Sequence, residues 1–353
     1  MEAKLLKEAL EKGKIERVSA EIEYLRFSVR FKGIERGTVV TANRIIPAYP
    51  HIKRIFTLEN GIRNNIKATT VYVEEKIDGY NVRILSINEK IYAFSRGGFL
   101  DVFVTEKARE MRLEKFFKEY PNYIICGEMI GNTPHTEPTK KFDVLLYIFD
   151  IDSGNEFVSC EERHKLVKKY KMVGVPVLGK FRTDDYSNLR KIILSLNKSC
   201  KEGMVIKSED RKEAVKYVTA HSDIEDIAQA SNRFFDMPIG FYHQRVLRSA
   251  MFINDFGMDR EEYAKKLGIA FYRGLESSIN NIKQKKEIVE EFEILIKDEK
   301  VWKDILKHSS KDAKITEIFR REEKGNTRIR FSRTYKNTKK ILSSYANGKA
   351  IED

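Results

Sequence analysis

The strongest constraint on the fold is a series of short apolar runs between residues 52 and 232. In order along the chain these runs are VYVEEKIDG, VRILSI, KIYAFS, YIICGEM, VLLYIFDI, GMVIKS and AVKYV. Their length and alternation are typical of strands, whereas KAREMRLEKFFKEY and EERHKLVKKY between them have helical character. Strands and helices do not alternate strictly, so we predict an α+β domain built around antiparallel sheets.

The segments on either side of this domain differ in character. A charged helix stopped by Gly13 and several short strands indicate a small N-terminal strand module, residues 1–51, before a catalytic domain of residues 52–235. Long stretches with helical apolar spacing follow, which predicts a helical domain over 236–298. The helical interpretation extends through KEIVEEFEILIKDEKVWKDILKH, residues 286–308. Two strands and a last helix are expected in a basic C-terminal domain, 299–353.

The net charge of +13 predicts attraction to polyanions, because neutralising phosphates releases counterions. General solubility of a lysine-rich chain is the alternative reading of that charge. In the C-terminal domain, Arg328, Arg330 and Arg333 alternate with Phe331 and Tyr335. Such a strand suits phosphate contacts and base stacking, although a charged edge strand that discourages aggregation would have the same pattern.

The three cysteines lie far apart and form no C-x-x-C pair, which favours a reducing compartment over a disulfide frame or a zinc knuckle. The N-terminus lacks the apolar core of a signal peptide, and no apolar run is long enough to span a membrane. We therefore expect a cytoplasmic protein with no membrane partner.

The segment Glu75-Lys76-Ile77-Asp78-Gly79-Tyr80-Asn81 is the most informative for chemistry. It places a lysine at the end of an apolar strand, with a carboxylate two residues later and a glycine for a tight turn. A lysine amine is a nucleophile only in its neutral form, which nearby cations, a metal ion or desolvation would favour. Alone, the motif is weak evidence for catalysis, because four such residues occur by chance and a surface hairpin with an Asp-Gly turn has the same pattern.

Further polar residues follow in a characteristic order. They occur in Ser95-Arg96-Gly97-Gly98, Cys126-Gly127-Glu128-Met129, Tyr147-Ile148-Phe149-Asp150, Glu202-Gly203-Met204-Val205-Ile206-Lys207 and Val215-Lys216-Tyr217. This series resembles the covalent nucleotidyltransferase superfamily, which comprises ATP-dependent DNA and RNA ligases and messenger-RNA capping guanylyltransferases. The resemblance implies a nucleotidyltransferase (ATP-grasp-like ligase) catalytic domain.

Three details resemble RNA ligases in particular. Asn81 stands where DNA ligases and capping enzymes typically have arginine. The only tryptophan, Trp302, is far from the final lysine motif, near which DNA ligases usually carry one. The N-terminal module, SRGGF and GFYHQRVLRSAMF together resemble the archaeal homodimeric ATP-dependent RNA ligases of the circularising type.

The resemblance implies that Lys76 attacks the α-phosphorus of ATP to form lysyl-AMP. AMP then passes to the 5′-phosphate of a single-stranded RNA, and a 3′-hydroxyl displaces it. Glu128 would bind the ribose, Phe149 would stack on adenine, and Glu74 or Glu75 would lie near the base. Mg²⁺ or Mn²⁺ is expected on charge grounds.

Other implied roles concern the phosphates and the nucleic acid. Glu202 and Asp78 are the expected metal site, and Asp78 and Asn81 would position metal-bound water or the attacking hydroxyl. Arg96 would contact the ribose or the nucleic-acid end. Lys207 and Lys216 would hold the phosphates, but Ala214 replaces a lysine often found in this motif, so the helper of Lys216 could be Lys207 or Lys212.

Two alternatives remain at this stage. A DNA ligase is disfavoured by Asn81, whereas activity on single-stranded DNA is not. A non-catalytic RNA-binding protein with a decayed fold would not be expected to retain Lys76, Glu128, Glu202 and Lys216. The sequence also predicts a homodimer through the helices of residues 236–298, a prediction that depends on the family resemblance as well as on apolar spacing.

Overall fold

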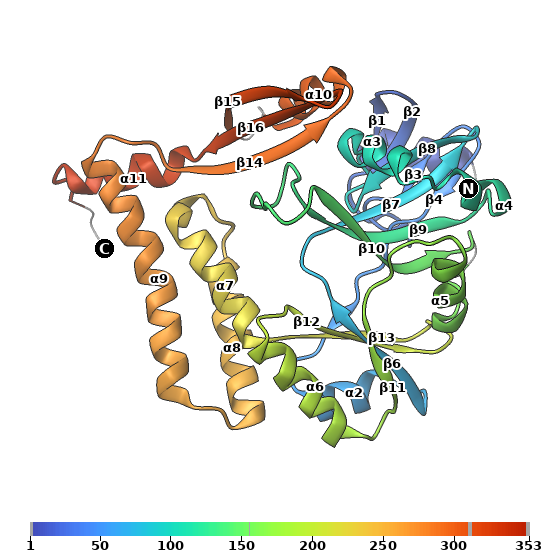
Figure 1. Cartoon of the computed structure of the whole chain (residues 1–353), viewed down its shortest axis with the longest axis horizontal. Helices are drawn as coiled ribbons and strands as arrows, with labels where there is room; N and C mark the ends of the chain where they lie inside the picture. Colours follow the sequence, from blue (N-terminus) through green and yellow to red (C-terminus); the bar gives the residue numbers. More distant parts are fainter. Residues whose placement is uncertain (1–2, 155, 310–312, 351–353) are drawn as a thin grey trace.

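The computed structural model of the chain describes residues 3–154, 156–309 and 313–350. Two sheets lie at its centre, and helices cover their outer sides (Figure 1). The first sheet is antiparallel, in the order β10-β9-β7-β8. Its strands are β7 (Tyr80–Ile87), β8 (Lys90–Ser95), β9 (Ile124–Gly131) and β10 (Val144–Asp152).

The second sheet has the order β11-β6-β12-β13-β5 and is antiparallel except for the parallel pair of β13 and β5. Its strands are β5 (Lys53–Arg54), β6 (Thr70–Lys76), β11 (Val177–Arg182), β12 (Gly203–Ser208) and β13 (Ala214–Val218). The predicted α+β class with antiparallel sheets is therefore confirmed.

Each sheet buries one face under helices. The second sheet directs Val71, Val73 and Met204 into a core shared with Ile193 and Phe252 of its covering helices. These helices are α2 (Leu58–Asn65), α6 (Tyr186–Lys198) and α8 (Phe241–Phe256). The first sheet packs on α3 (Val102–Glu110), α4 (Glu114–Glu119) and α5 (Cys160–Lys169). Because side chains alternate across a strand, the opposite face of the second sheet carries polar residues, and that of the first sheet is shared between polar residues and the N-terminal segment.

The N-terminal segment forms a small sheet in the order β1-β2-β3-β4 beside β8. Tyr24, Val39 and Ile46 from this sheet pack against Leu85 and Phe94. Its elements are α1 (Ala3–Glu11), β1 (Ile15–Ser19), β2 (Glu23–Phe27), β3 (Val39–Val40) and β4 (Ile45–Ile46).

Helices follow the second sheet, and a three-stranded sheet, β14-β16-β15, ends the fold. The remaining elements are α7 (Ala220–Ala230), η1 (Ser231–Asp236), α9 (Arg260–Lys283), β14 (Val289–Ile296), α10 (Glu299–Ser309), β15 (Lys314–Glu323), β16 (Asn326–Thr334) and α11 (Lys336–Ala346). In the described ranges, no helix combines the length and apolarity needed to cross a membrane.

The prediction of a helix across residues 286–308 is wrong for residues 289–296, which form the strand β14. Phe292, Ile294 and Ile296 are buried at every second position, and Phe292 and Ile294 pair with Phe331 and Ile329 of β16. The intervening glutamates face outward, so the segment has the two-residue period of a strand. Because β14 precedes residue 299, the C-terminal sheet includes residues from both sides of the boundary predicted there.

The C-terminal sheet is attached at both ends. The backbone N–H groups of Lys297 and Asp298 donate to the Glu106 carboxylate on α3. At the other end, Asn337 and Thr338 at the start of α11 donate to Asp236 of η1. Figure 1 shows the resulting arrangement, in which β14 spans from the helices α9 and α11 to the region of α3.

Candidate active site

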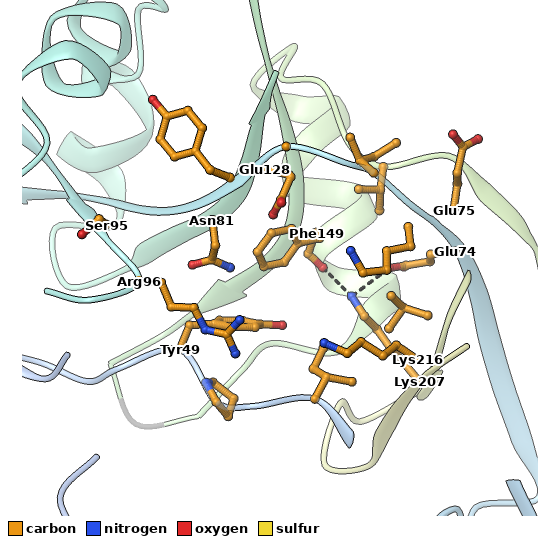
Figure 2. Close-up of a pocket in the computed structure, with 18 of the residues that line it drawn as sticks. Tyr49, Glu74, Glu75, Asn81, Ser95, Arg96, Glu128, Phe149, Lys207 and Lys216 are labelled. Atoms are coloured by element: carbon orange, nitrogen blue, oxygen red, sulfur yellow. Dashed lines mark hydrogen bonds and ion pairs between the residues drawn. The ribbon is translucent and has the colours of Figure 1, made fainter. Parts of the chain in front are cut away.

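A cavity of about 460 Å³ lies between the two central sheets. Most of the predicted nucleotide-binding residues line it, as Figure 2 shows for those it labels. The lining includes Glu74, Glu75, Lys76, Asn81, Arg96, Glu128, Phe149, Lys207 and Lys216. These residues are far apart in the sequence. They meet in one cavity because most of them lie on the inward face of a strand or close to a strand end.

Lys76 is the last residue of β6 and is followed by a close approach of two backbones. A Cβ atom at Gly79 would lie 2.4 Å from the carbonyl oxygen of Met129 on β9, so only glycine fits there. This contact holds the turn after Lys76 against β9. The Lys76 Nζ donates to Glu202 Oε2 at 2.5 Å, just before β12.

Burial raises the pKa of Glu202 to about 7; Lys76 opposes this shift and Asp78 adds to it. The pKa of Asp78 is raised as well, first by burial and then by Asp226. Asp78 does not line the cavity. In the described part of the chain, no three His, Cys, Asp or Glu side chains gather to hold a metal ion by themselves.

Asn81 and Glu128 lie directly opposite each other on β7 and β9. Burial raises the pKa of Glu128 to about 7, with Lys76 opposing and Glu202 reinforcing the shift. The Asn81 Oδ1 atom is buried and has no hydrogen-bond partner among the described residues. Both side chains point toward the cavity (Figure 2), where a ligand could satisfy them.

Phe149 forms part of the cavity wall beside Tyr49, with ring centroids 5.1 Å apart. Figure 2 shows the Phe149 ring near the centre of the cavity, between Asn81, Glu128 and the lysines. Glu75 points away from the centre in the same view and pairs with Lys201 at 3.0 Å. Of the two glutamates predicted near the base, Glu74 is the one directed inward.

Lys207 is 1% exposed and makes two hydrogen bonds and an ion pair at the base of the cavity. Its Nζ donates to the Phe149 carbonyl oxygen at 2.7 Å and to Asp150 at 3.1 Å, and it pairs with Glu74 at 2.8 Å. The protein itself therefore surrounds this ammonium with acceptors, which a phosphate would have to displace. The other helper considered from the sequence, Lys212, is exposed and lies outside the cavity lining.

Buried charges surround Lys207. Burial would raise the pKa of Glu74, but Lys207, His164 and Arg163 outweigh it and hold that pKa well below its usual range. Arg163 also donates to the Phe149 carbonyl, and Arg211 to Asp150. Sequence reasoning missed Arg163, Arg211 and Tyr49. Their acidic partners, Glu74 and Asp150, are far away in the sequence, so no local pattern indicates these contacts.

Two further cations, Lys216 and Arg96, line the cavity. Burial, followed by Arg54, Lys76 and Arg96, lowers the pKa of Lys216 to about 8. The Arg96 Nη2 atom lies 2.8 Å from His51 Nδ1. The cavity wall thus combines the aromatic rings of Phe149 and Tyr49 with the cationic side chains of Lys216 and Arg96, which suits a ligand with a ring and phosphates.

The three C-terminal arginines differ in their contacts. Arg328 pairs with Glu293 and Glu323, and Arg330 pairs with Glu291. Arg333 forms no ion pair within the described residues; its guanidinium lies 4.9 Å from the Phe292 ring centroid. The pKa of His135, which lines the cavity, is lowered to about 4 by burial and then by Arg333. Of these three arginines, Arg333 is the one whose charge influences His135 of the cavity lining.

Comparison with known proteins agrees with this geometry. The RNA ligase family matches residues 69–218, which hold Lys76 and most of the cavity lining. The family described as the ligase Pab1020 C-terminal region matches residues 229–349. This chain belongs to the RNA ligase family. As an RNA ligase it is an enzyme, and the predicted superfamily is confirmed.

Solved structures resemble this RNA ligase along nearly its whole length. Form 2 of an archaeal ATP-dependent RNA ligase has a TM-score of 0.88 at 26% identity, covering 99% of this chain and 97% of the other. A protein of Aquifex aeolicus, named as a candidate ATP-dependent DNA ligase, has a TM-score of 0.93 at 32% identity, with 99% and 100% coverage. The predicted resemblance to archaeal ATP-dependent RNA ligases is thereby confirmed.

A relative from Methanocaldococcus jannaschii, described as uncharacterized, is 32% identical over 350 residues. The match covers 93% of this RNA ligase and 88% of that protein. The common architecture therefore includes the N-terminal strand module and the C-terminal sheet as well as the catalytic sheets.

Proposed function

We propose that this RNA ligase uses Lys76 to attack the α-phosphorus of ATP, forming lysyl-AMP and pyrophosphate. AMP then moves to the 5′-phosphate of a single-stranded RNA, and a 3′-hydroxyl attacks the activated end and releases AMP. One observation carries the proposal. Lys76 lines a cavity whose wall also carries the aromatic rings of Phe149 and Tyr49 and the cations Lys216 and Arg96, and its amine is held by Glu202.

The aromatic part of the cavity wall suits the adenosine part of ATP. Phe149 offers a ring for stacking, and Lys207 and Arg163 hold its backbone carbonyl in place. Glu128 would accept hydrogen bonds from the ribose hydroxyls, and the inward-facing Glu74 lies near the position of the base. In this proposal Lys207 positions Phe149 and Glu74, and the phosphate contacts fall to Lys216 and Arg96.

The residues also fit a divalent ion that arrives with the phosphates. Mg²⁺ is usually held by one or two carboxylates together with substrate phosphate oxygens and water, and Glu202 and Asp78 are two such carboxylates. When bound, Mg²⁺ or Mn²⁺ would neutralise charge on the phosphates. Lys216 and Arg96 would stabilise the charge that develops as pyrophosphate leaves.

Glu202 has a further role in this scheme. Its carboxylate accepts a hydrogen bond from the Lys76 ammonium at 2.5 Å, within reach for taking the proton that must leave before attack. Asp78 and Asn81 are proposed to orient the groups that react after lysyl-AMP has formed. The unpaired Asn81 Oδ1 is available to accept a hydrogen bond from a ribose hydroxyl.

A homodimer through the helical region is proposed as well. Leu247 on α8 and Tyr272 on α9 are 58% and 64% exposed, and Ile269 and Ile279 on α9 are also exposed. A second copy would cover these apolar side chains. Sedimentation at micromolar concentration should give twice the monomer mass, and a monomer would contradict the dimer. A cytoplasmic location stays a prediction.

The substrate is tested by sealing assays. Single-stranded RNA with a 5′-phosphate and a 3′-hydroxyl should be joined in the presence of ATP and Mg²⁺, whereas a nicked DNA duplex should not. Single-stranded DNA measured in parallel tests the remaining alternative. Efficient sealing of the nicked duplex without joining of RNA would establish a DNA ligase and contradict the proposal.

A further inference from the structure

Four residues lie side by side across the second central sheet. Glu74 on β6 pairs with Val205 on β12, Val205 pairs with Lys216 on β13, and Lys216 pairs with Arg54 on β5. Neighbouring strands are about 4.8 Å apart, so Arg54 is one strand beyond Lys216. Ile55, the next residue, is buried in the core on the other face. Arg54 therefore lies on the face that bears Lys216 and the cavity.

The Arg54 guanidinium is an unsatisfied cation in this position. Its Nη1 atom is buried without a hydrogen-bond partner, and Arg54 forms no ion pair with any described residue. The neighbouring arginines differ, because Arg248 pairs with Asp223 and Arg245 pairs with Asp226. Arg54 as a whole is half-buried, but a buried guanidinium nitrogen without a partner is costly, which indicates that a ligand supplies the missing acceptor.

The surroundings favour an anion with more than one negative charge. Burial and Arg248 lower the pKa of Arg54, and Asp223 and Glu202 only partly offset them. Arg54 in turn contributes to the lowered pKa of Lys216, as do Lys76 and Arg96. A guanidinium forms paired hydrogen bonds to phosphate oxygens, so a phosphate bound between Arg54 and Lys216 would relieve this repulsion.

We propose that Arg54 binds the pyrophosphate portion of ATP, on the side of the α-phosphorus opposite Lys76. This inference rests on the proposed function, in which Lys76 is the nucleophile. Phosphoryl transfer places the attacking and leaving groups roughly in line. Lys76 lies on β6, whereas Lys216 and Arg54 lie on β13 and β5, further along the same sheet. A leaving group that departs from Lys76 in this direction would contact Lys216 first and then Arg54.

The step balances without another reactant. The neutral Lys76 amine forms the nitrogen–phosphorus bond, the bond from the α-phosphorus to the bridging oxygen breaks, and pyrophosphate leaves with that electron pair. In the reverse direction, pyrophosphate attacks lysyl-AMP and regenerates ATP. The same in-line geometry brings the 5′-phosphate of RNA to this position in the next step, because it too attacks opposite Lys76.

Pyrophosphate is the probe for the test. Wild-type enzyme, Arg54→Gln and Arg54→Lys are loaded with excess ATP, desalted and treated with increasing pyrophosphate, and loss of lysyl-AMP is followed by intact mass. Lys53→Gln is the matched control: like Arg54 it is not part of the cavity lining, but Lys53 is exposed and its amine donates to Asn65 Oδ1. Thermal unfolding checks each variant, and transfer of AMP to 5′-phosphorylated RNA is measured on the same loaded proteins.

Arg54→Gln should raise the half-saturating pyrophosphate concentration about tenfold or more, equivalent to about 1.4 kcal/mol of binding. Arg54→Lys should lie between it and wild type, and Lys53→Gln should stay within about twofold. An unchanged half-saturating concentration in a folded Arg54→Gln would overturn the proposal, and so would a defect confined to RNA transfer. Absence of lysyl-AMP in the wild type would instead contradict the proposed function itself.

Discussion

The Lys76 ammonium nitrogen lies 2.5 Å from the Glu202 carboxylate, which ties the end of β6 to the residue before β12. The pair is largely buried, with side-chain exposures of 20% for Lys76 and 13% for Glu202. This contact keeps the proposed nucleophile in place but also holds its proton. The chemistry of the site therefore depends on how readily the carboxylate takes up that proton.

Glu202→Gln should slow formation of lysyl-AMP by about 10²- to 10⁴-fold, because an amide cannot accept the Lys76 proton. Burial raises the pKa of Glu202 to about 7 in the metal-free site, so at low Mg²⁺ the wild-type rate should fall as the pH decreases through 7, whereas bound Mg²⁺ should move this fall to lower pH. Single-turnover adenylylation between pH 5.5 and 8 measures both effects. Glu209→Gln, at an exposed glutamate paired with Lys180, is the control and should be close to wild type. Unimpaired adenylylation in Glu202→Gln would show that the proton leaves by another route.

The lowered pKa of Lys216 predicts how the adenylylation rate changes on the alkaline side of the pH profile. Its pKa is lowered to about 8 by burial and then by neighbouring cations, so the ammonium loses its charge as the pH rises through 8. The adenylylation rate should decline there, since a neutral amine stabilises phosphate charge poorly. Lys216→Arg keeps its charge and should move this decline to higher pH, even if its rate at pH 7.5 is lower. A decline at the same pH in this variant would assign it to another group.

Because Lys207 forms buried ion pairs, replacing it should lower the free energy of unfolding strongly. Lys207→Met leaves Glu74 and Asp150 without one of their cations, and breaking a buried pair in this way costs about 3–5 kcal/mol of unfolding free energy. Denaturant titration measures this loss. Lys212→Met, at the exposed lysine of the same segment, should change stability by no more than about 0.5 kcal/mol. Equal effects of the two substitutions would argue against the buried network.

The sequence predicts much of the site because strand alternation fixes which side chains share a face. Val71 and Val73 enter the core, so Glu74 and Lys76 face the cavity, as do Val205 and Lys216 on neighbouring strands. The same alternation cannot show that Lys207 is paired. Its acids lie on β6 and β10, far away in the sequence, and only the packed sheets bring them together.

Two other features were beyond sequence reasoning for related physical reasons. β14 contains three glutamates and a leucine, which are common in helices, but its pairing with β16 makes the segment a strand. Arg54 belongs to a strand of only two residues, whose parallel pairing with β13 is a tertiary contact. No local pattern marks it as a neighbour of Lys216.

The C-terminal arginines should contribute unequally to RNA binding. Arg333 has no acidic partner within the described residues and affects His135 in the cavity lining, whereas Arg330 is paired with Glu291. Arg333→Gln should weaken binding of single-stranded RNA and reduce the slope of log K against log salt by nearly one phosphate contact, about 0.7. Arg330→Gln is the matched variant and should change the slope less. Equal slopes for wild type and Arg333→Gln would contradict a phosphate contact at Arg333.

Covalent labelling tests the central claim most directly. Wild type and Lys76→Arg, which keeps the charge beside Glu202, are incubated with Mg²⁺ and either α-labelled ATP or α-labelled GTP, and analysed on a denaturing gel. Intact mass before labelling identifies any protein that already carries AMP. The account predicts label from ATP alone, located on Lys76 by peptide mapping and absent from Lys76→Arg. Label that persists in the variant, or wild-type protein that is free of AMP yet gains no label, would contradict it.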